Sequence, residues 1–236
     1  MIDKKNNIKM KKAFFFLAMA AMLLASCDKD DNKPDNPEPD GVWVDLGLPS
    51  GLLWAKCNLG ATAPEEYGDY IAWGETQGKD LYRWITYRHC TVDADSNLAT
   101  LTKYNTSTDL GTVDGLTTLE SVDDAAAVRL GNGARTPTKE EWQELLDNTT
   151  AEWTTINDVN GCKFTGPNGN SLFLPAAGAI YRSRASLDGR NGIYWSSSLR
   201  SDTPSEAFGF RIISDMQLIG HGDRYYGFSV RAVKRK

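Results

Sequence analysis

The sequence predicts an α+β fold, because apolar and polar residues alternate near both ends of residues 41–236 and two helix signals lie between those ends. The alternation is the pattern of half-buried strands. The helix signals are capping residues followed by apolar residues at helical spacing. Strands at both ends with helices between them are typical of antiparallel sheets packed against helices.

The first two strands are predicted to pair as a hairpin. Val42-Trp43-Val44-Asp45-Leu46 alternates, Pro49-Ser50-Gly51 has turn-forming residues, and Leu52-Leu53-Trp54-Ala55 follows as the partner strand. Near the other end, residues 208–213 alternate. The last predicted strand is Phe228-Ser229-Val230-Arg231-Ala232-Val233.

Two helices are predicted between these strands. The first begins at Ser121 as its N-cap, carries two aspartates in its first turn and ends before Gly131. The second begins with a capping box, in which the side chains of Thr138 and Glu141 each accept a hydrogen bond from the backbone amide of the other residue. Its apolar residues lie on one face, which would pack on a sheet: Trp142, Leu145 and Leu146.

The chain begins as an exported protein does. Five lysines in residues 1–12 precede an apolar run at residues 13–25, which is too short for a comfortable membrane span and is typical of a secretory signal. Leu24-Ala25-Ser26-Cys27 resembles the bacterial lipobox, in which the cysteine becomes the lipidated first residue. We therefore predict a signal peptide at residues 1–26 and lipidation at Cys27; an ordinary secretory signal is the alternative.

The residues after the signal are predicted to form a tether and one domain. Residues 27–40 read as a lipidated, acidic, proline-rich tether, because they lack the apolar side chains needed to fold. Residues 41–236 are long enough for one domain. Removing the signal takes away five lysines and one aspartate, which changes the net charge from −5 to −9. This balance excludes nucleic acid as an expected partner, and membrane contact is expected through the lipid anchor only.

The remaining cysteines indicate neither a metal site nor a nucleophile. Cys57, Cys90 and Cys162 can form at most one disulfide, and the sequence leaves the pairing open. No C-x-x-C spacing and only two histidines are present, so no zinc or other cofactor is expected. His89 adjoins Cys90, but neighbouring residues on a strand point to opposite faces.

Seven segments form an ordered pattern across residues 42–233. They are VDLGLPSGLLWA (44–55), YIAWGET (70–76), DDAA (123–126), RTPTKEEW (135–142), TGPNGNSLFLPAAG (165–178), YWSSS (194–198) and GFSVR (227–231). The fourth resembles the R-L-P-T-x-x-E-W signature of C-type-lectin-like folds of the formylglycine-generating-enzyme type. The whole set resembles the Fibrobacter succinogenes major paralogous domain, common in surface lipoproteins of Bacteroidetes.

The resemblance implies a single C-type-lectin-like domain at residues 41–236, with its first and last strands paired and its loops gathered on one side. The acidic run after Cys27 resembles the export signal of Bacteroides-type lipoproteins, which implies an outer-membrane lipoprotein facing the cell exterior; surface or periplasmic orientation stays open. Two departures concern disulfides. Thr149 and Thr150 stand where family members often have a cysteine, and Cys162 stands where an aromatic residue is usual.

The same comparison argues against an enzyme. Formylglycine-generating enzymes hold copper with a pair of C-terminal cysteines, and this chain has none after Cys162. The Glu-Pro-Asn and Trp-Asn-Asp tripeptides of calcium-dependent lectins are absent. Residues 93–97 begin like a calcium loop, but Leu98 and Tyr104 replace the glycine and glutamate that such a loop needs.

Two groups of polar and aromatic residues are candidates for ligand binding. The first lies in the presumed loops between Leu199 and Tyr226, a stretch that resembles the variable region of retroelement-diversified lectin-fold proteins. Its candidate contacts are Arg200, Asp202, His221, Asp223, Arg224, Tyr225 and Tyr226. The second group could take a carboxylate or sulfate: Arg182, Arg184 and Arg190. Ordinary solvated loop residues are the alternative for both groups.

These observations lead to a functional expectation. We expect a surface lipoprotein that acts without catalysis as a binding or adhesion module for a glycan or protein ligand. The alternative is a structural minor subunit of a surface appendage, which would present unpaired strand edges. An enzyme of the formylglycine-generating type ranks third.

Overall fold

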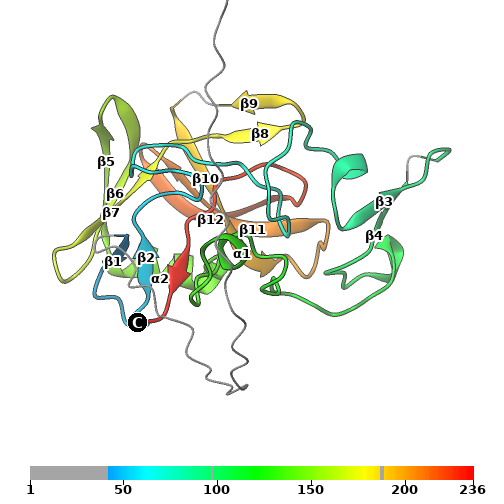
Figure 1. Cartoon of the computed structure of the whole chain (residues 1–236), viewed down its shortest axis with the longest axis horizontal. Coiled ribbons are helices and arrows are strands. Elements are labelled where there is room, and N and C mark those ends of the chain that lie inside the picture. The colour runs from blue at the N-terminus through cyan, green and yellow to red at the C-terminus, as the bar shows by residue number, and fades with distance from the viewer. Residues whose placement is uncertain (1–41, 97, 187–188) are drawn as a thin grey trace, which may run out of the picture. The chain divides into compact units, whose positions relative to one another are not determined.

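The computed structural model of the chain describes residues 42–96, 98–186 and 189–236 (Figure 1). The predicted signal, tether and Cys27 lie outside these residues. The helices are α1 (Ala125–Leu130) and α2 (Lys139–Asn148), with 3-10 helices η1 (Trp84–Thr86) and η2 (Thr108–Leu110). The strands are β1 (Trp43–Asp45), β2 (Leu53–Ala55), β3 (Cys90–Val92), β4 (Ala99–Leu101), β5 (Thr150–Ile156), β6 (Val159–Thr165), β7 (Ser171–Pro175), β8 (Ala179–Tyr181), β9 (Arg184–Ser186), β10 (Asn191–Leu199), β11 (Glu206–Ile213), β12 (Met216–Asp223) and β13 (Val233–Lys234).

The predicted α+β class is confirmed. Within the described residues the named strands pair antiparallel, in the orders β1-β2-β13, β5-β6-β7 and β10-β11-β12, with two further hairpins, β3-β4 and β8-β9. Figure 1 shows the β10–β12 sheet at the centre, with β5–β7 to one side and α1 and α2 below it. The β5–β7 meander was not among the elements that the sequence predicted.

The first hairpin is confirmed, and it decides where the last strand binds. Trp43 lies opposite Ala55 across β1 and β2, and the turn between them closes at Gly51, whose φ of 67° suits glycine. Because β1 occupies one edge of β2, β13 pairs with the other edge. The prediction that the first and last strands pair directly is therefore wrong: both lie in one sheet, but β2 separates them.

The second helix begins as predicted and the first one later than predicted. In α2, the Thr138 hydroxyl accepts the amide of Glu141, and the Glu141 carboxylate accepts the amide of Thr138. In α1 the N-cap is Asp124, not Ser121, because the Asp124 carboxylate accepts the amides of the first helical turn. That carboxylate also accepts a bond from the Thr136 hydroxyl at 2.7 Å, which ties α1 to the start of the second helix.

The last predicted strand is mostly not a strand. Only Val233–Lys234 forms one, and residues 228–232 instead run between other segments. Successive residues of this segment form isolated bridges with different segments, Phe228 with Ile71 and Ser229 with Tyr194. The sequence therefore alternates as a strand does, although no continuous strand pairing forms.

The core lies between α2 and the central sheet. The Trp142 ring stacks on Phe210, with 4.7 Å between ring centroids, and contacts Trp54 at 4.8 Å. Its indole N–H donates to the carbonyl of Trp195, and the indole N–H of Trp195 donates to the carbonyl of Ile71. The predicted apolar face of α2 is confirmed, since Trp142 and Leu145 are fully buried. Trp195 is also buried and belongs to the core.

A buried arginine fixes the segment that leads to β13. Arg231 has no exposed surface, and its guanidinium donates to the side-chain oxygen of Asn58 and to the carbonyls of Ala55, Lys56 and Phe173. No carboxylate forms an ion pair with it among the described residues. Desolvation lowers the pKa of Arg231 to about 10, which still leaves the side chain charged at neutral pH.

We predict that Arg231→Met lowers the free energy of unfolding by about 3–5 kcal/mol, because it leaves four buried oxygen acceptors without a donor. Urea unfolding measures this change. The control is Arg211→Met, which alters an exposed arginine on β11 and should change stability by less than about 0.5 kcal/mol. Equal stability of Arg231→Met and the unaltered chain would show that the desolvation of the guanidinium cancels its hydrogen bonds.

Candidate functional site

The structure brings three of the predicted residues together in a charged cluster. The Arg200 guanidinium lies 3.0 Å from the Asp202 carboxylate and 2.6 Å from the Glu206 carboxylate. His221 lies 2.7 Å from the same Glu206 oxygen. Because the charges in this cluster are paired with one another, its groups are less available to a ligand than the sequence suggested.

Most of the presumed loop between Leu199 and Tyr226 is a hairpin. β11 and β12 pair along their whole length, with Glu206 opposite Asp223 and Phe208 opposite His221. The expectation of loops between Leu199 and Tyr226 is wrong over Met216–Asp223, which is a strand. This register explains why Glu206, which the sequence analysis did not select, meets His221.

Arg224 is not on the surface. It has no exposed area, and its guanidinium donates to the Tyr87 hydroxyl and to the carbonyls of Lys103, Tyr104 and Pro204. Its guanidinium carbon also lies 4.9 Å from the centre of the Trp73 ring. The assignment of Arg224 as a ligand contact is therefore corrected: it anchors three loops from inside.

Tyr225 and Tyr226 belong to a row of four half-buried rings, which we call the aromatic row: Trp84, Tyr225, Tyr226 and Tyr181. Successive ring centroids lie 4.9, 4.7 and 4.7 Å apart, and each pair is arranged edge to face. The sequence analysis did not select Trp84, because it comes from η1, far from the tyrosines in the chain.

Backbone contacts build the aromatic row from three segments. Ile180 in β8 exchanges two hydrogen bonds with Gly227, which sets Tyr181 beside Tyr226. The amide of Tyr82 donates to the carbonyl of Arg182 at 2.7 Å, which brings the η1 segment to the same place. The row is thus supported by main-chain pairing, so its spacing does not depend on the rings alone.

The surroundings of the row raise the pKa values of the Tyr225 and Tyr226 hydroxyls. Partial burial raises the pKa of Tyr226, and hydrogen bonding to the Asp223 carboxylate raises it further. Burial likewise raises the pKa of Tyr225, while Arg182 acts in the opposite direction. Both hydroxyls therefore stay protonated at neutral pH; because they bond with Asp223 and with each other, their oxygen lone pairs are the groups that can accept hydrogen bonds from a ligand.

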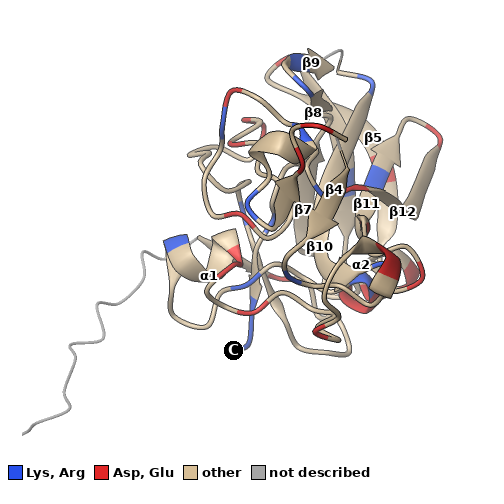
Figure 2. Cartoon of the chain, turned by 90° about the vertical axis from the view of Figure 1, so that its right-hand side faces the viewer, with Lys and Arg blue, Asp and Glu red and all other residues tan. Residues whose placement is uncertain are grey.

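The three predicted arginines of the second group lie on or next to the β8–β9 hairpin, and all are exposed. Figure 2 shows basic residues on this hairpin. Arg182 has a φ of 62°, a conformation that a non-glycine residue adopts only when its neighbours hold it there. Arg182 and Arg184 flank the aromatic row; Arg190 follows residues 187–188, which are not described.

The described residues do not provide an activated nucleophile or a metal centre. Burial raises the pKa of the Cys57, Cys90 and Cys162 thiols, the last to about 12, so these thiols stay protonated. All three are free, which settles the disulfide question left open by the sequence. No group of three or more metal-binding side chains forms in the described ranges.

Comparison of the chain with protein-family models, curated proteins and solved structures finds no match in any of the three. None of the helices in the described part of the chain has the length and apolarity needed to span a bilayer.

One buried histidine makes stability depend on pH. His89 is 6 % exposed, and its Nε2 atom lies 2.8 Å from the carbonyl of Gly74. Desolvation lowers the pKa of His89 below 6.5, although Asp123, with a carboxylate oxygen 3.7 Å away, opposes this effect. The unfolded chain thus binds this proton more readily than the folded chain does.

We predict that the free energy of unfolding falls as the pH drops through the unfolded-state pKa of His89, about 6.5, toward its lower folded-state pKa. Above about pH 7 the histidine is neutral in both states and this cost vanishes. Urea unfolding at about pH 7 and pH 5.5 measures the effect. His89→Gln should reduce the difference between the two pH values; an unchanged difference would show that other groups cause it.

Proposed function

We propose that this protein is a lipoprotein of the outer membrane, anchored through Cys27 and facing the cell exterior, whose folded part is a non-catalytic binding and adhesion module for a glycan or protein ligand. The aromatic row is the observation that carries the proposal. The lipid anchor and the location rest on the lipobox resemblance and the acidic residues that follow it.

The aromatic row has the physical properties of a recognition surface. Its rings offer a large contact area, and tyrosine and tryptophan lose few rotatable bonds when they become ordered. The ring faces can contact the apolar faces of a sugar or of a protein side chain. The guanidiniums of Arg182 and Arg184 supply hydrogen-bond donors, and the hydroxyl oxygens of Tyr225 and Tyr226 can accept hydrogen bonds.

We further propose a C-type-lectin-like fold and membership of the Fibrobacter succinogenes major paralogous domain family. The supporting observations are the ordered set of resembling segments and the sheet that contains both β1 and β13. The buried roles of several matched residues agree with a shared scaffold: Trp54, Trp73, Trp142, Trp195 and Arg231.

A structural subunit of a surface appendage is the second candidate, and one observation favours it. β12 is eight residues long and lies at the edge of its sheet, since it pairs with β11 alone among the described strands. An edge of this length can accept a strand from another chain. Such a subunit would form ordered assemblies in its purified state.

We predict that the chain takes up a palmitate analogue during growth of a bacterial host that processes lipoproteins, and that Cys27→Ser abolishes the label. The thiol of Cys27 is the expected acylation site, since it stands at the end of the lipobox. The matched control is Cys57→Ser, which changes another cysteine and should keep the label. Label retained by Cys27→Ser would contradict the anchor.

We predict that the purified chain binds a subset of a glycan array in the presence of EDTA, because its proposed ligand face needs no metal. Tyr225→Ala/Tyr226→Ala should lower the affinity by about tenfold or more, a loss of about 1.4 kcal/mol or more. Tyr225→Phe/Tyr226→Phe separates ring contact from hydrogen bonding by the hydroxyls.

The control for the array is Tyr67→Ala, which removes a half-buried tyrosine outside the aromatic row and should leave binding unchanged. Binding that vanishes with EDTA would contradict a metal-free site. Silence of the unaltered chain across the array would exclude the glycan ligand and leave a protein ligand or an assembly partner.

A further inference from the structure

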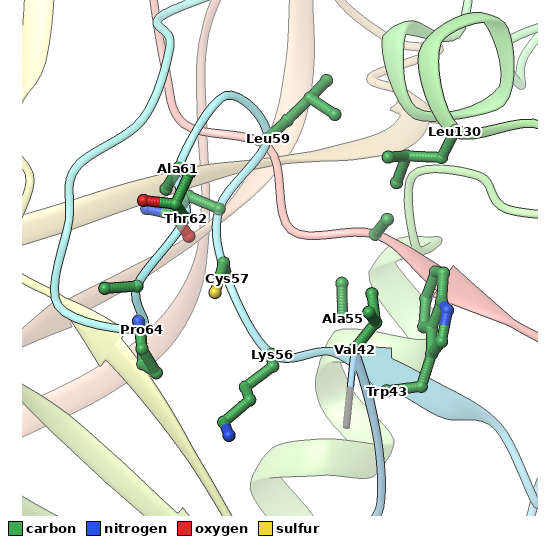
Figure 3. A pocket seen from close by; sticks show the side chains of 13 residues that line it. Val42, Trp43, Ala55, Lys56, Cys57, Leu59, Ala61, Thr62, Pro64 and Leu130 are labelled. Carbon is green, nitrogen blue, oxygen red and sulfur yellow. The ribbon is translucent and has the colours of Figure 1, made fainter. Parts of the chain in front are cut away.

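A second candidate site lies away from the aromatic row, in two adjoining hollows beside β1 and β2. Each has a volume of about 430 Å³, which is within the range of small-molecule sites. Lys56 and Pro64 line both hollows, so the two meet along that edge. We call the pair the Lys56 groove; Figure 3 shows the first hollow from close by.

The walls of the first hollow are mostly apolar. They include Val42, Trp43, Leu59, Leu130 and Ala232. Val42 and Leu130 are each 41 % exposed, which is unusual for aliphatic side chains that share one concave surface. In Figure 3 the side chain of Leu130 approaches from α1, opposite the segment that carries Lys56 and Cys57. The apolar part of a ligand would cover these side chains.

The polar wall of the same hollow carries positive charge. The buried Arg231 guanidinium lies directly behind it, because it binds Ala55, Lys56 and Asn58, all three of which line the hollow. The Lys56 carbonyl accepts one of these bonds, so the N–H of the same peptide group, which belongs to Cys57, points the other way. That N–H has no partner among the described residues.

Two lysines add to the positive charge of the groove. Neither Lys56 nor Lys163, which lines the second hollow, forms an ion pair within the described residues. Hydrogen bonds hold two nearby acids in place: Glu66 accepts from the amides of Thr62 and Ala63, and Glu65 accepts from the side-chain amide of Asn157. A third acid, Glu152, lies opposite Lys163 across β5 and β6 without forming an ion pair with it among the described residues. At Cys57 the positive charges of Arg231 and Lys56 therefore act more strongly than the negative charges of Glu65 and Glu66.

From this juxtaposition we propose that the Lys56 groove binds an amphipathic anion, a carboxylate attached to an aliphatic chain. The carboxylate lies against the Lys56 ammonium and the Cys57 N–H, with the charge of Arg231 behind them. The aliphatic chain covers Val42, Trp43 and Leu130. This site is independent of the aromatic row, so either one can fail without the other.

The test is a titration of the purified chain carrying Cys27→Ser, which removes the predicted acylation site, with decanoate and with 1-decanol. The amide spectrum of isotope-labelled protein reports both affinity and place. Decanoate should shift the amide of Cys57 and its neighbours in residues 55–64. 1-Decanol has the same aliphatic chain without the charge and should bind about tenfold more weakly, since a charge-assisted hydrogen bond is lost.

Lys56→Glu should weaken decanoate binding by about tenfold or more while leaving the rest of the spectrum unchanged. The matched control, Lys139→Glu, makes the same charge change at a half-buried position on α2, which does not line the groove, and should have no effect. Ala63→Phe fills the hollow without a charge change and should also block binding.

Three results would overturn the proposal. The first is no spectral change with decanoate. The second is equal affinity for decanoate and 1-decanol, because the anion would then have no role. The third is shifts that map away from residues 55–64, or that persist unaltered in both Lys56→Glu and Ala63→Phe.

Discussion

Buried side-chain donors that bind backbone carbonyl oxygens hold this fold together. Long segments such as residues 56–89 have little sheet to pair with, yet they lie over the core, and a buried carbonyl without a donor destabilises a fold. Arg231 and Arg224 supply several donors each to three such segments, and the indole N–H of Trp73 and the hydroxyl of Tyr87 supply further ones. A guanidinium is well suited to this role because it presents five N–H groups in a fixed plane.

The elements that the sequence predicted correctly depend on neighbouring residues. The capping box of Thr138 and Glu141 forms within one turn of helix, and the turn at Gly51 needs only a residue that tolerates positive φ. Residues 228–232 show the limit of such patterns, because their alternation is set by separate contacts with Ile71 and Tyr194 rather than by one partner strand. Local periodicity does not even separate buried from exposed side chains here, since residues 228–233 are all buried.

Long-range placement explains why only part of the candidate site could be predicted. The tyrosines at 225 and 226 were selected as amphipathic side chains in a polar stretch, but Trp84 joins them through an edge contact across about 140 residues of chain. Arg224 was selected for the same stretch, and arginine is rarely buried without a carboxylate. Its burial follows from four oxygen acceptors that the sequence does not place near it.

The two buried arginines act differently on the surfaces above them. Three aromatic rings lie within 5.8 Å of the Arg224 guanidinium, and their negative faces partly offset its charge. Arg231 is bound only by neutral oxygens, and the peptide groups that point their carbonyls at it turn an N–H to the opposite side. The guanidinium that fixes the last segment therefore also places positive charge behind the wall of an apolar groove in an acidic chain.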